Sequence, residues 1–140
     1  MSEVFLVDKS ALARVERHAA ARAAFFELDE IGTLATCAIV DVEVGYSARA
    51  AGDYESTRRN REALYLDLPI TREVTRRALA VQRELAAIGH HRAAGIPDLL
   101  IAACAELHDA VVVHYDRDFE AIARVTGQPV RWLVPAGTVS

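Results

Sequence analysis

The sequence VFLVD at residues 4–8 is a short apolar run that ends in an aspartate. AVVVHYD at residues 110–116 repeats the pattern near the other end of the chain. Neither run alternates apolar and polar residues, and such runs are typical of parallel strands that helices cover on both faces. Because ligand crevices in these sheets lie outside the carboxyl ends of the strands, we expect Asp8 and Asp116 to face one crevice.

Helical and extended segments alternate along the rest of the sequence. We expect the two apolar runs to form strands at residues 3–7 and 110–114, and further strands at residues 33–36, 66–70 and 130–134. Helices are expected to start at residue 10 and to cover residues 17–31, 37–50 with Gly52 at its end, 53–64, 71–88 with Gly89 at its end, 98–105 and 118–125. This order predicts an α/β fold with three layers, α/β/α, around a central, mainly parallel sheet of four or five strands.

The composition suits one compact domain, because 140 residues of which 52% are hydrophobic can bury a sizeable core. We therefore expect residues 1–140 to form a single domain. The N-terminus lacks the basic start and apolar stretch of a signal peptide, and no segment reaches the length of a membrane span. We expect a soluble, cytoplasmic protein without membrane contact, in which Cys37 and Cys104 are reduced core residues.

The net charge of −4 argues mildly against a general nucleic-acid coat, which normally depends on clustered basic residues. The basic residues are nevertheless almost all arginine and locally dense, at Arg58, Arg59 and Arg61 and again at Arg72, Arg76 and Arg77. Two interpretations stay open for these arginines: a patch that binds RNA or an acidic partner, and an ordinary solvated helix face.

Two more acids occur in apolar surroundings: Glu43 in an apolar helix and Asp98 at the start of another. By itself Asp98 is typical of a helix cap. The presence of three other acids at comparable positions, Asp8, Glu43 and Asp116, favours a functional site instead. Converging carboxylates repel one another unless a cation balances them. Hard divalent ions such as Mg²⁺ and Mn²⁺ prefer these oxygen ligands, and such sites commonly act on phosphate esters.

Four blocks of the sequence together resemble, in order and separation, the signature of PIN-domain ribonucleases and, more narrowly, of VapC toxins. They are FLVDKS at residues 5–10, VEVGY at 42–46, IPDLLIAA at 96–103 and VVVHYDRDF at 111–119. The resemblance spans most of the chain, and the ordered set is far more specific than any single block. It implies that the whole chain is one PIN-like domain.

The resemblance also implies the site. Asp8, Glu43, Asp98 and Asp116 would be the acidic quartet around Mg²⁺ or Mn²⁺, with Asp118 as a further nearby acid and metal contact. The hydroxyl of Ser10 would support Asp8. The implied activity is an endoribonuclease that hydrolyses RNA with metal-activated water and leaves 5′-phosphate and 3′-hydroxyl ends.

Two positions depart from the family pattern. The family often has Ser or Thr three residues before the helix glutamate and two residues before the fourth acid, whereas this chain has Val40 and His114. The hydrogen bonds around the acids are therefore expected to differ. We expect His114 to be a partly buried strand residue at the edge of the crevice and not a ligand, because hard cations prefer oxygen.

The resemblance implies three partners: an RNA substrate such as transfer or ribosomal RNA, a cognate VapB-type antitoxin, and a second copy of the chain in a homodimer. Candidate contact surfaces are the apolar faces of the early helices, with Phe25 and Phe26, and of the helix around Tyr46. The alternative for these residues is ordinary core.

Two other functions remain open. A haloacid-dehalogenase-type phosphatase also has an aspartate after its first strand, but it needs a second aspartate two residues later, where this chain has Ser10. A non-catalytic binding domain could keep the fold and use the crevice only for a partner. All four acids of the quartet are present, which favours the nuclease.

Overall fold

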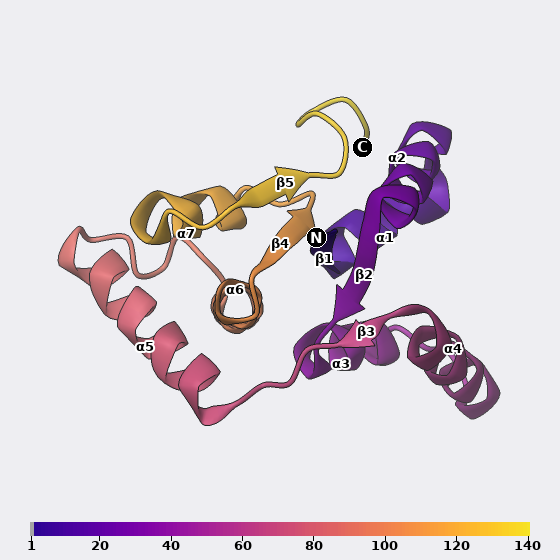
Figure 1. The fold of residues 1–140 in the computed structure, drawn as a ribbon, viewed down its shortest axis with the longest axis horizontal. Coiled ribbons are helices and arrows are strands. Elements are labelled where there is room, and N and C mark those ends of the chain that lie inside the picture. Colours follow the sequence, from indigo (N-terminus) through magenta and orange to yellow (C-terminus); the bar gives the residue numbers. More distant parts are fainter. Residues whose placement is uncertain (1) are drawn as a thin grey trace.

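The computed structural model describes residues 2–140, and within them one parallel sheet is formed by five strands in the order β3-β2-β1-β4-β5 (Figure 1). The strands are β1 (Glu3–Val7), β2 (Gly32–Thr36), β3 (Leu66–Asp67), β4 (Ala110–His114) and β5 (Val130–Trp132). Every neighbouring pair runs parallel. The predicted parallel sheet is therefore confirmed.

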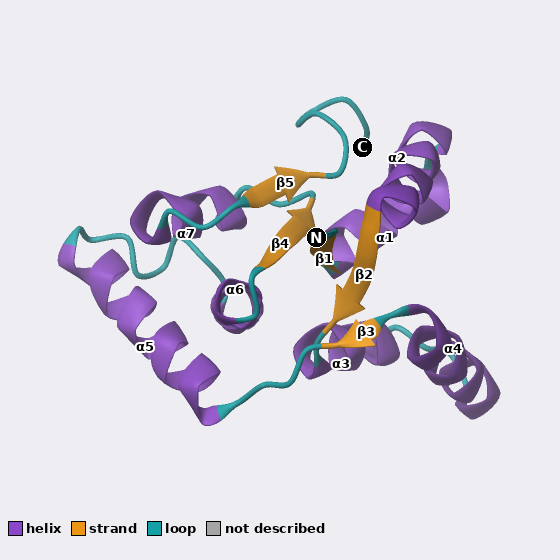
Figure 2. Cartoon of the chain, in the orientation of Figure 1, coloured by secondary structure: helices purple, strands orange, loops and turns teal. Residues whose placement is uncertain are grey.

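Seven helices lie between these strands in residues 2–140 (Figure 2). They are α1 (Lys9–Arg17), α2 (Ala19–Ile31), α3 (Ala38–Tyr46), α4 (Ala51–Leu64), α5 (Arg72–Ala87), α6 (Ile96–Leu107) and α7 (Asp118–Thr126). In residues 2–140, no helix combines the length and the apolar character that crossing a membrane requires.

The two faces of the sheet carry separate hydrophobic cores. Successive side chains of a strand point to opposite faces, so Phe5 packs with residues of α1 and α2, while Leu6 packs with residues of α3, α5, α6 and α7. Both side chains are fully buried. The helices therefore cover both faces of the sheet, and the three-layer α/β/α architecture is confirmed.

The helix predicted over residues 37–50 is wrong at its end. It was expected to reach residue 50 with Gly52 as its end, but α3 ends at Tyr46, and Gly52 lies in the first turn of α4. The reason is tertiary. A side chain at Gly45 would meet the ring of Tyr54 at 2.8 Å, so α4 folds back closely onto α3 and the chain must turn earlier.

The chain winds outward from β1 in both directions, through β2 and β3 on one side and through β4 and β5 on the other. Strands β1 and β4 are direct neighbours, with Val7 beside Val113. The crevice of a doubly wound sheet lies outside the carboxyl ends of the strands at such a switch point. Asp8 and Asp116 follow these two strands, so both lie at this crevice.

Candidate metal centre

Asp8 is held in place by the neighbouring strand β4 and by Ser10 in the first turn of α1. Its backbone N–H donates to the carbonyl oxygen of Val113 at 2.8 Å, and its carboxylate Oδ2 accepts from the Ser10 N–H at 3.0 Å and from the Ser10 hydroxyl at 2.6 Å. The Ser10 oxygen accepts in turn from the Tyr115 N–H at 2.9 Å. Ser10 therefore links the ends of β1 and β4 and fixes the carboxylate between them.

Three other carboxylates converge next to Asp8. Asp116 follows β4 and accepts from the Asp118 N–H at 3.0 Å, while Asp118 accepts from the Gly95 N–H at 3.3 Å. Asp98 lies in the first turn of α6. One carboxylate oxygen from each of Asp98, Asp116 and Asp118 lies within 4.8 Å of the others. Asp118, expected as a further nearby acid and metal contact, is thus a member of the tightest group.

Asp8 and Glu43 belong to the same electrostatic cluster. Burial raises the pKa of Asp8, the Ser10 hydrogen bonds oppose this rise, and the charge of Asp116 adds to it. Burial also raises the pKa of Glu43, and the charge of Asp8 raises it further. Within residues 2–140, the buried Oε1 atom of Glu43 has no hydrogen-bond partner. A buried carboxylate oxygen without a protein donor is able to bind a cation or to accept from a water molecule.

The repulsion between the acids is clearest in the pKa of Asp98. Burial, followed by the charges of Asp8, Asp116 and Asp118, raises the pKa of Asp98 to about 8. At neutral pH the acids therefore share a proton unless a cation balances them. The donor set consists of carboxylate oxygens on rigid helix and strand ends, which are the ligands that Mg²⁺ and Mn²⁺ prefer. The site fits a hard divalent ion.

His114 is fully buried between Phe119 and Trp132, with ring centroids at 5.2 Å and 4.9 Å, and not partly buried as expected. Its Nδ1 accepts from the Asp116 N–H at 3.1 Å, and burial lowers its pKa to about 4. The neutral imidazole thus takes the place of the family's hydroxyl next to the fourth acid. Its ring lies in the core. Val40, the other position that departs from the family pattern, is also fully buried and packs from α3 into the core.

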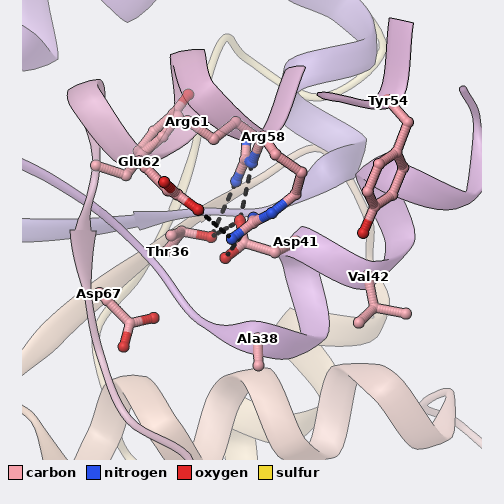
Figure 3. Close-up of a pocket in the computed structure, with 10 residues that line it drawn as sticks. Thr36, Ala38, Asp41, Val42, Tyr54, Arg58, Arg61, Glu62 and Asp67 are labelled. Atoms are coloured by element: carbon pink, nitrogen blue, oxygen red, sulfur yellow. Dashed lines mark hydrogen bonds and ion pairs between the residues drawn. The ribbon is translucent and has the colours of Figure 1, made fainter. Parts of the chain in front are cut away.

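The first arginine stretch does not form an exposed basic patch. Arg61 is buried, and it donates to Asp41 at 2.8 Å and to the Thr36 hydroxyl at 2.9 Å (Figure 3). Arg58 pairs with Asp41 at 3.4 Å and with Glu62 at 3.2 Å. These residues line a cavity of about 490 Å³ on the α4 side of α3. Their charges are balanced within the protein, so both open interpretations fail for Arg58 and Arg61.

The second stretch is divided. Arg77 pairs with Glu106 at 2.5 Å, while Arg72 and Arg76 are exposed on α5. Arg59 of the first stretch is exposed on α4. The exposed arginines fit the solvated helix face. Sequence patterns could not separate these cases, because pairing depends on which helices pack together.

The backbone donors of the site were also missed by sequence reasoning. The N–H groups of Gly95 and Tyr115 orient Asp118 and Ser10. No side-chain pattern reports such groups, because every residue except proline carries one.

The chain matches the family model of the PIN domain over residues 5–125. It is similar to ribonuclease VapC51 of Mycobacterium tuberculosis (strain ATCC 25618 / H37Rv), with 47% identity over 139 residues that cover 99% of each chain. Ribonuclease VapC21 of the same strain is 45% identical over 140 residues, again covering 99% of each chain.

Solved structures share the fold. VapBC-1 from nontypeable Haemophilus influenzae superposes with a TM-score of 0.77 at 13% identity, covering 93% of this chain and 98% of that chain. VapBC2 from Rickettsia felis, bound to a DNA fragment from its promoter, gives a TM-score of 0.75 at 17% identity, covering 91% and 97%. At such identities the likeness concerns the fold alone.

Proposed function

The chain belongs to the PIN-domain family and, within it, to the VapC ribonucleases, and from this membership we propose that it is a metal-dependent endoribonuclease, the toxin of a toxin–antitoxin pair. The observation that carries the metal dependence is the convergence of Asp98, Asp116 and Asp118, whose oxygens lie within 4.8 Å of one another beside Asp8. Such a cluster in a folded protein holds its acids fully ionised only when a cation balances them.

Each acid has a proposed role. Asp8, Asp98, Asp116 and Asp118 hold Mg²⁺ or Mn²⁺. A bound divalent ion lowers the pKa of a water molecule and offsets charge on the phosphodiester. Glu43 orients the water or the ion with its unpaired Oε1. Ser10 fixes the Asp8 carboxylate, and His114 fixes the turn that carries Asp116.

The proposed products have 5′-phosphate and 3′-hydroxyl ends. Cleavage through the ribose 2′-hydroxyl would instead leave a cyclic phosphate, and it normally uses a general base such as histidine. His114 is fully buried and has its Nδ1 occupied by the Asp116 N–H, so it cannot reach a substrate. Attack by water on the phosphorus atom is the chemistry that these acids support.

We further propose that residues 1–140 act as one PIN-like domain. Helices pack on both faces of one sheet, and the acids come from segments spread from β1 to α7. A site assembled from both ends of the described chain needs the whole sheet. We expect the toxin to act in the cytoplasm, where transfer and ribosomal RNA are accessible.

A VapB-type antitoxin is the expected protein partner, since the structural neighbours are VapBC complexes. A groove of about 480 Å³ between α1, α2, α3 and α4 is lined by apolar side chains, including those of Leu12, Val15 and Phe25, and by polar ones, including that of Lys9. Phe25 is mainly a core residue, whereas Phe26 is 60% exposed and Tyr46 is 89% exposed. We propose the groove for the antitoxin and the exposed rings as contacts to a partner or a second copy.

Neither rival function gains support from the site. The residue two positions after Asp8, where a haloacid-dehalogenase-type phosphatase needs its acid, is Ser10, and its hydroxyl is fully engaged by Asp8 and Tyr115. A binding domain has no need for an acid whose pKa is raised to about 8.

The test is cleavage of a single-stranded RNA with Mn²⁺, with and without a chelator, followed by analysis of the RNA ends. We expect metal-dependent cleavage that leaves 5′-phosphates and is lost in Asp8→Asn, while Asp29→Asn on the exposed face of α2 keeps it. Cyclic 2′,3′-phosphate ends would contradict the mechanism. Hydrolysis of a small aryl phosphate without RNA cleavage would favour the phosphatase.

A further inference from the structure

Lys9 is the only lysine among the 16 lysine and arginine residues of the chain. It directly follows Asp8 and is the first residue of α1. A chain that uses arginine at every other basic position thus has its one ammonium group beside the first acid of the metal centre. Lysine offers a compact charge on a flexible stem, whereas arginine offers a broad planar fork, so the two are not equivalent in a confined place.

The Lys9 side chain reaches across to the helix that carries Glu43. Its Nζ donates to the hydroxyl of Ser47 at 2.5 Å, and Ser47 directly follows the last residue of α3. The positive charge of Lys9 lowers the pKa of Glu43, opposing the effects of burial and of Asp8. The ammonium therefore lies at the Glu43 side of the acidic cluster.

The Lys9 ammonium has a hydrogen-bond partner but no acidic partner in residues 2–140. Among the described residues, 2–140, Lys9 forms no ion pair, in contrast to Arg58, Arg61 and Arg77. An ammonium group has three N–H donors, and Ser47 accepts from one of them. The other donors are free to bind oxygen atoms of a ligand, and the residue is only half-buried, so a ligand can reach them.

The substrate of the proposed nuclease is an anion that must approach five carboxylates. Even with a divalent ion in place, these acids repel a phosphodiester, and the repulsion is strong at the short distances of an active site. Charge that develops on the phosphate oxygens during cleavage increases the need for a fixed positive group. Lys9 is the cation that the structure places beside Asp8 and Glu43.

We propose that Lys9 is a further catalytic residue of this chain: its ammonium, held by the Ser47 hydroxyl, binds a non-bridging oxygen of the RNA phosphodiester that is cleaved. This inference rests on the proposed function, because it assigns a residue to the same reaction. Ser47 is a positioning residue that acts through Lys9.

The main alternative is that Lys9 and Ser47 only tie α1 to α3. A tie of this kind stabilises the fold, and its loss lowers the melting temperature without a specific effect on RNA. A phosphate contact has the opposite signature. Its loss lowers cleavage, leaves the melting temperature unchanged and reduces the dependence of the reaction on salt.

The experiment compares Lys9→Met, Lys9→Arg and Ser47→Ala with the wild type, and uses Arg83→Met as the matched control. Arg83 is exposed on α5, at the far side of the sheet from α1 (Figure 1). For each protein, kcat and KM for an RNA oligonucleotide are measured over a range of salt concentrations, together with the melting temperature and the affinity for Mn²⁺.

We expect Lys9→Met to lower kcat/KM by about 10- to 100-fold, as for the loss of a hydrogen bond to a charged group. Its slope of log kcat/KM against log salt should be shallower by about 0.7, the value for one contact to a single strand. Its Mn²⁺ affinity should stay the same or increase, because a positive charge near the ion is removed. Lys9→Arg and Ser47→Ala should lie between Lys9→Met and the wild type, and Arg83→Met should match the wild type.

Cleavage by Lys9→Met within about twofold of the wild type overturns the inference, as does a loss that Arg83→Met shares or that weaker Mn²⁺ binding explains. If Lys9→Met does not fold, acetylation of the folded wild type replaces it, since Lys9 is the only side-chain amine. Acetylated protein that keeps its melting temperature and its full activity also overturns the inference. A wild type that cleaves no RNA with either ion contradicts the proposed function itself, which is a separate result.

Discussion

Asp41 and Glu43 lie two residues apart on α3 and have opposite surroundings. Asp41 is paired with Arg61 at 2.8 Å and with Arg58 at 3.4 Å, and its carboxylate also accepts from the Thr36 hydroxyl at 3.1 Å (Figure 3). Glu43 has a pKa that burial and the charge of Asp8 raise, and its buried Oε1 has no partner in residues 2–140. One side of the helix is electrostatically balanced, and the other is not.

The contrast separates a structural acid from a functional one. A buried charge that is paired and hydrogen-bonded holds two elements together, and here Asp41 attaches α4 to α3 and β2. A group of acids without counter-charges costs stability, and such a cost persists where a ligand or reaction needs it. Substitutions at the two positions should therefore have crossed effects on activity and stability.

The largest effect is expected for Glu43→Gln. We expect cleavage of RNA to fall by about 100-fold or more, because the residue that orients water or the ion loses its charge. The melting temperature without metal should stay the same or rise, since the repulsion with Asp8 is removed. The measurement is kcat with Mn²⁺ together with thermal unfolding in a chelator. A Glu43→Gln protein that is fully active would contradict the distinction between Asp41 as a structural acid and Glu43 as a functional one.

Arg61→Met should produce the converse result. Removing Arg61 leaves Asp41 largely buried, and we expect unfolding by urea to show a loss of about 3 kcal/mol. Cleavage per folded molecule should remain within a few-fold of the wild type at low temperature. Arg59→Met, at the exposed neighbouring position, is the control and should change neither quantity. An Arg61→Met protein that is stable but inactive would instead assign the paired side to the reaction.

The pH dependence of stability in Asp98→Asn gives a second test of the difference between a functional acid and a structural acid. The pKa of Asp98 rises from 3.8 to about 8, so the folded state holds more protons than the unfolded state within this window. Stability without metal must therefore fall as the pH rises from about 4 to about 8. At pH 8 Asp98→Asn should be more stable than the wild type by about 1 to 2 kcal/mol.

The difference should be small near pH 5, where Asp98 is protonated in the folded wild type. Mn²⁺ should stabilise the wild type at pH 8 and have little effect on Asp98→Asn. Chemical unfolding at both pH values, with and without Mn²⁺, provides the measurement. An Asp98→Asn protein that is equally destabilised at both pH values would show that Asp98 is a structural acid like Asp41.

Ser10→Ala is expected to have the smallest effect. The Asp8 carboxylate would lose one of its two bonds from Ser10, and the Tyr115 N–H would lose its acceptor. We expect cleavage to fall by about 10-fold and stability by about 1 kcal/mol, as for the loss of single hydrogen bonds. Ser10→Thr keeps the hydroxyl and should recover most of the activity. A Ser10→Ala protein that matches the wild type would remove Ser10 from the support of Asp8.

Much of the fold could be predicted because strong local signals mark it. The strand that ends at Val7 and the strand that ends at His114 occur at the predicted residues, since continuous apolar runs have few alternatives. Thr71 caps α5 at the predicted start of this helix, with its hydroxyl accepting from the Val74 N–H at 3.2 Å. The predicted end of α3 was wrong because the real end depends on the contact between Gly45 and Tyr54. No local sequence pattern reports a contact between two helices.

The sequence by itself determined the alternation of strands and helices and the placement of four acids at the ends of apolar segments. These features follow from side-chain periodicity and from the cost of burying charge, and both are local properties of the chain. Only the tertiary structure decided which charges are balanced. It paired Asp41 with Arg61, brought Asp118 into the tightest group of acids, buried His114, and left Lys9 with free donors beside Glu43. Charge pairing depends on distances between residues far apart in sequence, and these distances exist only once the helices have packed on the sheet.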